Sequence, residues 1–577
     1  MTQGQNTQGK LSNLITWCKD HGAIIDPRLS FEYSLEKGIS TLYKPDSDLD
    51  RHNQDTLSFS ISIPRELILV SSDARSFFDH LVPGFHSDLT SAALFKAFLG
   101  YKLSQNEAEQ NPYFQILPRA NEIRSPLGYN DEELALLKGT NLYRGTQVKL
   151  SQLQSEYKIL TEELSRSDSD MHIIDFDHFL WGHLILSSRS FPYKLVDKDA
   201  DPSSVMMVPL IDLMNHEPMG RVTWGYEEST GFTVQVDEGG KSGSTEIEIC
   251  NNYGPKGNEE LLVGYGFVIP DNQFDCLQLS LSEGSLRGMI GDAKLADWGI
   301  SHLPRLEDYT YSVVSEDADV GDNDSSRDPF IVFMCNRDHP IPDGLLELFA
   351  LISRNPEDES VTLKGELNGI NKLRASLDSR FKDKLDKMPA MTEGVSQLNY
   401  ENCRIYREGQ LKVYNLVKKT LKEREKELLK KNRKRLISIK DILKKDREQF
   451  EPFLKLYQLE DGDGLNKFQM ELLVHIWLMK VVNYESEDSV LSTGWIKDEF
   501  RRLKEEEVKV EHDPFLVDLY KQAIVPLLDN EDLRSLAEGH NWDVESFLLV
   551  DLVYQRNSYE KGSKLEPILI VPSTGGR

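Results

Sequence analysis

The chain has 577 residues, of which 39% are hydrophobic and 28% charged, and its formal net charge is -28. This length is too great for one hydrophobic core and predicts two or three domains. The acidic excess repels phosphate and disfavours direct binding to nucleic acid, and no apolar run approaches the roughly 18 residues that span a bilayer. The first ten residues lack the features of a secretory signal, so we expect the cytoplasm or the nucleus.

The first predicted elements are a short helix over residues 11–21 and strands over residues 57–70. Apolar residues of the first segment recur at near-helical spacing and stop before Gly22. In the second segment apolar and polar residues alternate before the run becomes continuously apolar, as in strands. Residues 44–55 between them are rich in Pro and Asp and predict a surface loop.

A helical block is predicted from about residue 77 to residue 170, because the apolar spacing there changes to a helical period. A further helix is predicted over residues 176–188. Short strands around residues 206–210, 221–226 and 232–236 follow it. The glycine-rich stretch 239–243 predicts a hairpin loop.

Beyond residue 275 the pattern favours long helices, most clearly over residues 410–450. That segment contains a basic run, which is Lys430, Lys431, Arg433, Lys434 and Arg435. We interpret the run as a solvated helix face rather than a nuclear-import or nucleic-acid patch, because glutamates lie among the lysines. The acidic stretch 316–328 predicts a disordered excursion.

The five cysteines lie far apart in the sequence, with no Cys-x-x-Cys and no Cys/His cluster of zinc-ligand spacing. Reduced thiols are therefore expected, and we predict no metal site.

Two segments become informative as a pair. Residues 208–217 read Val-Pro-Leu-Ile-Asp-Leu-Met-Asn-His-Glu, and residues 251–267 read Asn-Asn-Tyr-Gly-Pro-Lys-Gly-Asn-Glu-Glu-Leu-Leu-Val-Gly-Tyr-Gly-Phe. In order, separation and content they resemble the two signature motifs of SET-domain protein lysine methyltransferases.

Three more segments, residues 111–118, 125–140 and 179–191, look like the helical insert of the Rubisco-methyltransferase type of SET protein, which ends in an all-helical substrate-binding domain. The resemblance implies an α+β fold. We expect an N-terminal helix at residues 1–21 and a β-rich SET domain at residues 22–275 with its insert at about 77–175. An all-α substrate-binding domain is expected at residues 276–577.

The resemblance implies a protein-lysine N-methyltransferase that uses S-adenosyl-L-methionine and acts, as a monomer, on a basic protein. Residues 251–275 are most similar to the fungal enzymes that methylate a protein of the large ribosomal subunit. A cytochrome c lysine methyltransferase is the close alternative, and an actin-histidine methyltransferase is a more distant one. A catalytically silent SET-fold binding or assembly factor is the rival of another class; the intact Tyr265 and Asn215 argue against it.

Methyl transfer to an amine is an in-line displacement, in which the protein holds the reacting atoms about 3 Å apart and collinear. A lysine with a reference pKa near 10.4 must also lose its proton, which costs about 4 kcal/mol at neutral pH, and a dry aromatic channel offsets part of that cost. By its match to the family motif, Tyr265 is the predicted catalytic residue and also a donor contact. Tyr253 and Phe267 are predicted walls of the lysine channel, and Asp212 either approaches the substrate or braces the turn.

The resemblance also implies a set of donor-binding residues. Asn215 and His216 match the pair that binds S-adenosylmethionine, and Arg189 corresponds to the arginine that pairs with its carboxylate, a task suited to a planar guanidinium.

A donor loop is expected at Glu36, Lys37 and Gly38, where glycine would let the backbone approach the ligand. Ser40 stands where the family often has a second glycine. The protein substrate, the lysine position and the number of methyl groups added are not encoded in any motif that we identify.

Overall fold

The computed structural model describes residues 3–34, 37–43, 58–82, 85, 87, 89–105, 110–165, 174–201, 203–238, 246–299, 303–304, 330–355, 358, 360–445, 465–483, 493–508, 512–530, 541–562 and 565–572. The loops predicted at 44–55, 239–243 and 316–328 lie outside these residues. The chain forms two compact units. Unit 1 comprises Met1–Ser282, Pro304–Pro340 and Arg380–Leu416, and unit 2 comprises Glu283–Leu303, Ile341–Ser379 and Val417–Arg577.

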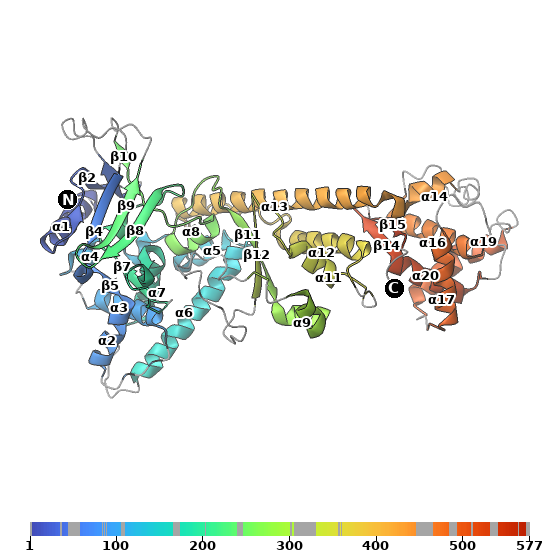
Figure 1. Cartoon of the computed structure of the whole chain (residues 1–577), viewed down its shortest axis with the longest axis horizontal. Helices are drawn as coiled ribbons and strands as arrows, with labels where there is room; N and C mark the ends of the chain where they lie inside the picture. The colour runs from blue at the N-terminus through green and yellow to red at the C-terminus, as the bar shows by residue number, and fades with distance from the viewer. Residues whose placement is uncertain are drawn as a thin grey trace. The chain divides into compact units, whose positions relative to one another are not determined.

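Unit 1 contains several small sheets (Figure 1). Their strands are β1 (Ile24–Ile25), β2 (Leu29–Ser34), β3 (Gly38–Tyr43), β4 (Ser58–Ile63), β5 (Leu69–Val70), β6 (Ser190–Pro192), β7 (Val205–Met207), β8 (Arg221–Glu227), β9 (Gly231–Asp237), β10 (Ile247–Glu248), β11 (Cys276–Ser282) and β12 (Phe330–Asn336). The sheet orders are β1-β4-β9-β8, β10-β3-β2, β5-β7-β6 and β11-β12.

The strand prediction for residues 57–70 is confirmed in β4, where Phe59, Ile61 and Ile63 are buried and the intervening Ser60 is exposed. β4 pairs antiparallel with β9, with Ile61 opposite Val234. The continuously apolar end of the segment forms a 3-10 turn and the short β5.

The insert of unit 1 is helical, as predicted. Its helices are α2 (Ser71–Leu81), α3 (Ser91–Ser104), α4 (Pro112–Ile116), α5 (Asp131–Ala135), α6 (Asn141–Ser165) and α7 (Phe176–Arg189). α3 and α7 pack closely because glycines face backbone at their contact. A Cβ on Gly182 would lie 2.1 Å from the Lys96 carbonyl oxygen, and one on Gly100 would lie 2.6 Å from that of His178. α7 leads directly to Arg189 and so positions a predicted site residue.

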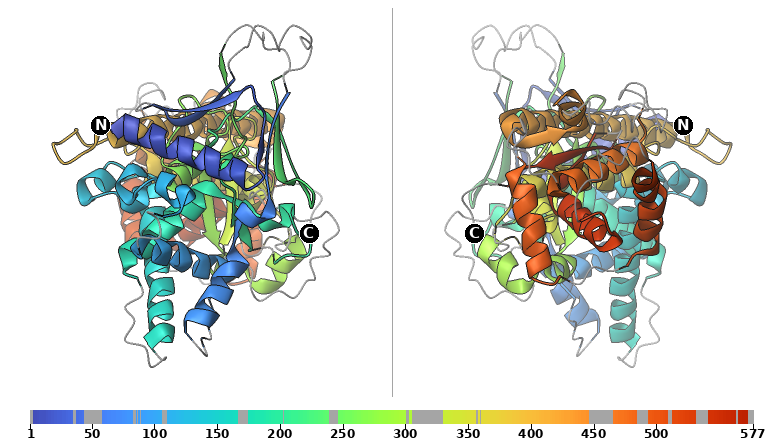
Figure 2. Two further views of the ribbon diagram at one scale, coloured as in Figure 1. Left: turned by 90° about the vertical axis from the view of Figure 1, so that its left-hand side faces the viewer. Right: turned by 90° about the vertical axis from the view of Figure 1, so that its right-hand side faces the viewer.

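The N-terminal helix α1 (Gln3–Asp20) begins well before residue 11, where the sequence pattern placed its start. Its early residues are polar and show no apolar period. Gln8 donates to the Phe31 carbonyl and accepts from the Tyr33 amide, at 3.1 and 2.9 Å, so this polar turn is tied to β2. α1 also packs against α4, and Figure 2 (left) shows it on the outer side of unit 1.

A short helix, α8 (Asn258–Tyr265), follows the second motif's loop in unit 1. The long helix α13 (Gln397–Lys431) contributes its first part to unit 1 and its last residues to unit 2.

The remaining helices and strands belong mostly or wholly to unit 2. They are α9 (Glu283–Ile290), α10 (Asp292–Trp298), α11 (Leu345–Ile352), α12 (Leu363–Phe381), β13 (Leu436–Ser438), α14 (Ile439–Lys445), α16 (Lys467–Asn483), α17 (Gly494–Glu505), α18 (Pro514–Ala523), α19 (Val525–Asp529), α20 (Val544–Asn557), β14 (Ser558–Lys561) and β15 (Glu566–Ile570). The helical character of the C-terminal region is confirmed, but the region is not all-α as expected, since it includes a small sheet, β13-β15-β14.

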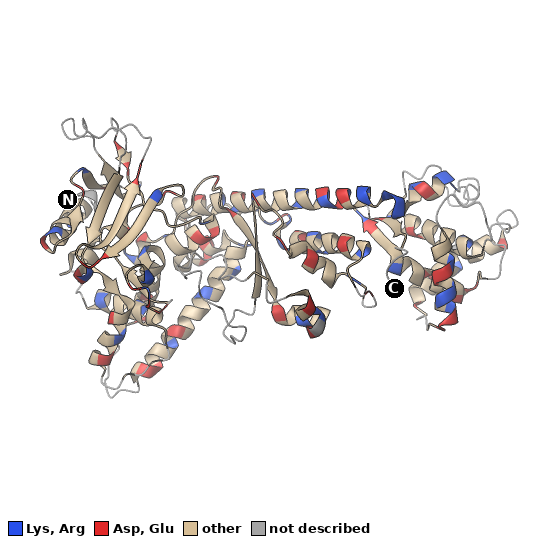
Figure 3. Cartoon of the chain, in the orientation of Figure 1, with Lys and Arg blue, Asp and Glu red and all other residues tan. Residues whose placement is uncertain are grey.

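The helix predicted over residues 410–450 has the wrong limits. α13 starts at Gln397 and ends at Lys431, because Leu436 and Ile437 leave the helical path to pair with β15 as buried strand residues. The basic run is correspondingly no continuous helix face, since Arg435 donates to the Val571 carbonyl at 3.1 Å. Figure 3 shows basic and acidic residues mixed along α13 itself.

Among the described residues no helix has the length and apolarity needed to cross a bilayer.

Candidate active site

The two motifs lie side by side in unit 1, although they are far apart in the sequence. The Asn251 amide donates to the Asn215 carbonyl at 2.8 Å, and the Glu217 amide donates to the Asn251 carbonyl at 2.9 Å. These bonds form a parallel bridge between His216 and Asn251. The bridge joins the predicted donor-binding pair to the loop that leads to Tyr265.

Four predicted site residues, His216, Tyr253, Tyr265 and Phe267, form one group, which we call the aromatic cluster. Tyr253 stacks with His216 at a centroid distance of 4.7 Å and with Tyr265 at 4.8 Å. Phe267 approaches His216 and Tyr265 edge-on, at 6.4 and 6.2 Å. Tyr253 is fixed further because its hydroxyl donates to the Met214 carbonyl at 2.7 Å.

His216 is neutral in this setting, and its tautomer follows from one contact. Its Nδ1 accepts from the Tyr253 amide at 3.0 Å, so the ring proton lies on Nε2. Burial lowers the pKa of His216 to about 4. Nε2 is buried and has no hydrogen-bond partner among the described residues. Burial likewise raises the pKa of Tyr265 far above neutrality, so its phenol stays protonated.

Tyr265 is the last residue of α8, and both ends of that helix are capped. At the N-terminus the Asn258 amide donates to Asp275 Oδ1 at 2.8 Å. At the C-terminus Gly266 takes a left-handed conformation, with φ of +79°, and its amide donates to the Leu261 and Leu262 carbonyls at 3.0 and 3.1 Å. The position of the phenol therefore depends on a glycine that directly follows it.

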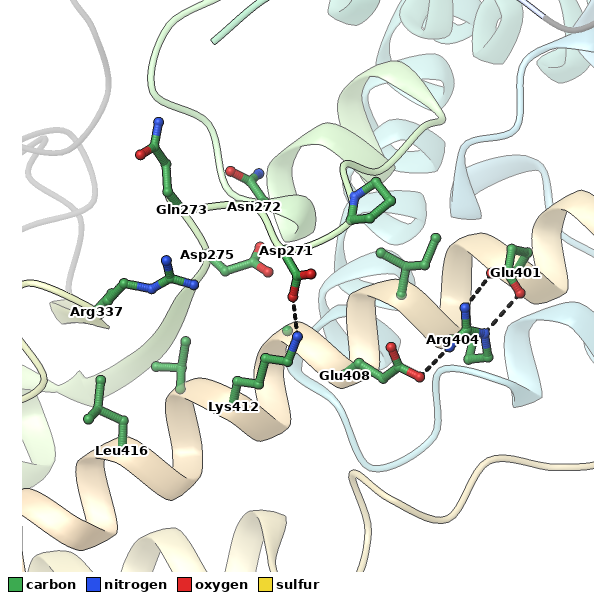
Figure 4. Close-up of a pocket in the computed structure, with 14 residues that line it drawn as sticks. Asp271, Asn272, Gln273, Asp275, Arg337, Glu401, Arg404, Glu408, Lys412 and Leu416 are labelled. Carbon is green, nitrogen blue, oxygen red and sulfur yellow. Dashed lines mark hydrogen bonds and ion pairs between the residues drawn. The ribbon is translucent and has the colours of Figure 1, made fainter. Parts of the chain in front are cut away.

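A pocket of about 210 Å³ lies between the 270–275 loop and α13 (Figure 4). Asp275 faces Gly409 of α13 there, where a Cβ would lie 2.0 Å from Asp275 Oδ2. Lys412 of α13 forms an ion pair with Asp271. None of the predicted site residues lines this pocket, so it is separate from the aromatic cluster.

The second group of predicted residues is Arg189 and Asp212. Arg189 Nη1 donates to the Asp212 carbonyl oxygen at 2.9 Å and lies 3.5 Å from its Oδ2. Tyr113 donates its hydroxyl proton to the same Oδ2 at 2.9 Å. Burial raises the pKa of Asp212 to about 6, although Arg189 and Tyr113 both act to lower it.

The turn that carries Asp212 is strained, since the preceding Leu210 is buried and has a φ of +67°. Such conformations in bulky residues are unfavourable and collect at functional sites. The turn and its arginine neighbour also carry polar atoms without partners among the described residues. Arg189 Nε and Asp212 Oδ1 are both buried and lack hydrogen-bond partners within the described part of the chain.

Asn215 connects the first motif to β3. Its Nδ2 donates to the Ile39 carbonyl at 3.1 Å and to Glu248 Oε1 at 2.7 Å. Glu248 also pairs with Lys37 at 3.0 Å.

The expected donor loop is only partly visible. Gly38 begins β3 with a φ of +72°, Lys37 is exposed, and Glu36 lies outside the described residues.

Two residues of the site were not identified from the sequence. Tyr113 lies in residues 111–118, which served only for the family resemblance. Its local sequence does not distinguish a site tyrosine from an ordinary buried one. Glu248 lies in a short strand with no distinguishing motif. In the described part of the chain no three His, Cys, Asp or Glu side chains gather as a metal site.

Comparison with known proteins agrees with this geometry. A family described as EFM1 middle domain matches residues 305–432. Ribosomal lysine N-methyltransferase 1 of Saccharomyces cerevisiae is 28% identical over 81% of this chain and 86% of its own length. Protein-lysine N-methyltransferase EFM1 of the same yeast is 23% identical over 98% of both chains.

Among solved structures, Rubisco LSMT bound to AdoMet is similar with a TM-score of 0.52 and 19% identity, over 73% of this chain and 93% of that one. The SET domain of LSMT bound to lysine and AdoHcy gives a TM-score of 0.53 at 17% identity, with 73% and 92% covered. The chain thus has a SET-domain fold with a helical insert and a helical C-terminal region, in which the two motifs are joined. Two protein-lysine methyltransferases match most of its length, so the chain is a protein-lysine N-methyltransferase of the SET class.

Proposed function

We propose that this protein-lysine N-methyltransferase transfers a methyl group from S-adenosyl-L-methionine to a lysine of a basic protein of the large ribosomal subunit. The observation that carries the proposal is the bridge between Asn215-His216 and the loop before Tyr265, which brings a donor-binding motif and an aromatic cluster together. The name of the yeast relative, ribosomal lysine N-methyltransferase 1, supports the substrate class.

The residues at the first motif fit the donor. Buried polar atoms in proteins are almost always hydrogen-bonded, so Arg189 Nε, Asp212 Oδ1 and His216 Nε2 indicate a polar ligand. Arg189 suits a carboxylate, Asp212 Oδ1 suits an ammonium group, and the Nε2 proton of His216 suits an acceptor. When bound, the donor supplies a methyl group on a positively charged sulfur.

The aromatic cluster fits the acceptor. Aromatic walls disfavour the ammonium form of lysine by desolvation and so favour the neutral amine that the reaction requires. The protonated phenol of Tyr265 can accept or donate a hydrogen bond at the amine, and Tyr253 is held by its own bond to Met214. The cluster thus orients the amine and limits water, which are the main tasks of a displacement catalyst.

A second candidate substrate is favoured by one observation. The match to protein-lysine N-methyltransferase EFM1 covers 98% of both chains, which is more than the ribosomal relative covers. The second candidate substrate is therefore the protein that protein-lysine N-methyltransferase EFM1 methylates. In either case the net charge of -28 favours a basic partner.

The test is methylation of purified large-subunit ribosomal proteins, total soluble protein and cytochrome c with radiolabelled donor. We expect one labelled band in the ribosomal fraction. Tyr265→Phe should lose label by roughly a hundredfold while donor binding persists, since removal of one positioned polar group at a reacting centre has effects of that order. Tyr226→Phe, in β8 of the same unit, should be unchanged.

Each other outcome has a defined meaning. Full activity of Tyr265→Phe would remove this residue from the mechanism. A labelled band outside the ribosomal fraction supports the EFM1-like substrate. Label on cytochrome c alone supports a cytochrome c lysine methyltransferase. Absence of both label and donor binding would indicate a silent binding factor.

A further inference from the structure

Tyr113 makes a contact that the activity described so far does not use. It lies in α4 of the helical insert, is 1% exposed, and donates its hydroxyl proton to Asp212 Oδ2 at 2.9 Å. The two residues are 99 positions apart in the chain. A buried phenol and a buried carboxylate so placed represent a specific polar contact inside an otherwise apolar core.

Tyr113 is held in place through its own backbone and through the packing of α1 on α4. Asn111 caps the first turn of α4, where its side chain accepts from the Tyr113 amide at 2.9 Å. α1 packs against the other side of α4 and brings the buried Cys18 near both Tyr113 and Asp212. The backbone of Tyr113 is therefore set by the α4 cap, and its hydroxyl by the bond to Asp212.

The titratable and charged groups that face the Asp212 carboxyl come from several elements. They are Tyr113 of α4, Arg189 of α7, Cys18 of α1 and Tyr253 of the second motif. Of these, only Tyr113 and Arg189 bond to Asp212 side-chain oxygens within the described residues.

Arg189 alone does not fix the orientation of the carboxylate. Its short bond, 2.9 Å, goes to the Asp212 main-chain oxygen, and its distance to Oδ2 is 3.5 Å, beyond the normal range of a strong hydrogen bond. The shorter bond to the side chain comes from Tyr113, at 2.9 Å, and it holds Asp212 Oδ2 toward α4. Consequently Oδ1 is left without a partner in the described structure, as is Arg189 Nε.

We propose that Tyr113 is a positioning residue for donor binding, which orients Asp212 so that its Oδ1 and Arg189 Nε together meet the charged amino-acid end of the methyl donor. The inference rests on the proposed function. It assigns to the helical insert a direct part in setting donor affinity, through a hydroxyl that itself does not contact the donor.

The test compares Tyr113→Phe with wild type by calorimetric titration of S-adenosylhomocysteine between about pH 5 and about pH 8. Affinity near pH 8 should fall about tenfold, the size expected for a hydrogen bond to a charged group. The turnover rate at saturating donor should stay within about threefold, since the reacting atoms are untouched. Tyr157→Phe is the matched control, because that insert tyrosine bonds the Ile174 carbonyl instead, at 3.0 Å.

The pH dependence of donor binding distinguishes a positioning role of Tyr113 from a role in packing alone. The Tyr113 bond lowers the pKa of Asp212, so its loss should move the acid limit of donor binding to higher pH. In an Asp212→Asn background, Tyr113→Phe should cause no further loss of affinity, because the two residues act through one contact.

Unchanged affinity and an unchanged acid limit in Tyr113→Phe would overturn the inference. Equal losses in Tyr157→Phe, or additive losses in the double variant, would overturn it as well. Failure of the wild-type chain to bind S-adenosylhomocysteine would instead contradict the proposed function.

Discussion

Gly266 shows how strongly one residue can constrain this site. It ends α8 directly after Tyr265, with a φ of +79°. A Cβ there would lie 2.8 Å from the Arg124 amide nitrogen and 3.0 Å from its carbonyl carbon, both backbone atoms. A side chain would therefore meet conformational strain and a steric clash together.

We expect Gly266→Ala to lower the free energy of unfolding by about 3 kcal/mol or more and to reduce methylation, because α8 must shift. Gly38→Ala is the matched control, since Gly38 also has a positive φ but open space around its Cβ position. It should cost only about 1 kcal/mol. Thermal unfolding of both variants checks the difference, and equal losses would mean that the Arg124 contact is unimportant.

For single residues, the two motifs predicted correctly which side chains lie together in the aromatic cluster. His216, Tyr253, Tyr265 and Phe267 do come together, because each motif is a continuous stretch whose local order survives folding. Their catalytic and binding roles remain predictions. Tyr113 could not be found in this way, since its partner lies 99 positions away and no local pattern encodes such a pair.

The helices α8 and α13 are linked by a partly buried polar contact. Tyr406 of α13, which is fully buried, donates to Glu259 Oε2 of α8 at 2.7 Å. Burial raises the pKa of Glu259 to about 7, against the lowering effect of this bond and of Arg380. α13 therefore braces the helix that carries Tyr265, through a carboxyl whose pKa is raised toward neutral pH.

Since the folded state holds this proton more tightly than the unfolded state, its contribution to stability falls as pH rises from about 4.5 to about 7. Glu259→Gln cannot ionise and should gain on the order of 2 kcal/mol relative to wild type between about pH 5 and about pH 8. Urea unfolding at both pH values measures this gain. Glu260→Gln, the exposed neighbour, should show none, and a pH-independent difference for Glu259→Gln would contradict the assignment.

Elements with a clean apolar period were predicted well, and those set by distant partners were not. The helix expected over 176–188 is α7, Phe176–Arg189. The one expected over 410–450 was wrong, because Leu436 to Ser438 find strand partners in Ile570 to Ile568, far along the chain. The apolar pattern alone missed the start of α1, since Gln8 is stabilised by β2 rather than by an apolar face.

For the whole molecule, the charge of -28 is the dominant electrostatic property. Acidic and basic residues are nevertheless interspersed over the described helices (Figure 3), so the attraction for a basic partner comes from the summed charge. Such attraction is screened over a Debye length of about 10 Å at 0.1 M salt.

We therefore expect KM for the basic protein substrate to rise severalfold between roughly 0.05 and 0.3 M sodium chloride, with little change in kcat. The affinity for donor serves as the internal control and should change far less. Steady-state kinetics at fixed saturating donor provides the measurement. A KM that is insensitive to salt would show that recognition does not depend on net charge.

The domain organisation was predicted from the length of the chain and from the family resemblance. The division predicted at residue 275 remains a prediction, and the compact units divide the chain elsewhere, since residues 304–340 and 380–416 fall with unit 1. Sequence periodicity carries no information about which distant segments share a core, so this could not be read from the pattern.

The contact between α8 and α13 also constrains how the enzyme folds during its synthesis. A nascent chain that has emerged as far as Asp275 already has both motifs and both caps of α8, yet Glu259 still lacks Tyr406 and Asp275 still lacks the Gly409 surface. Translation must continue by more than a hundred residues before those partners leave the ribosome. Until then the helix that carries Tyr265 lacks its α13 partners on one side. The active enzyme therefore cannot form as soon as its two signature motifs have been synthesised.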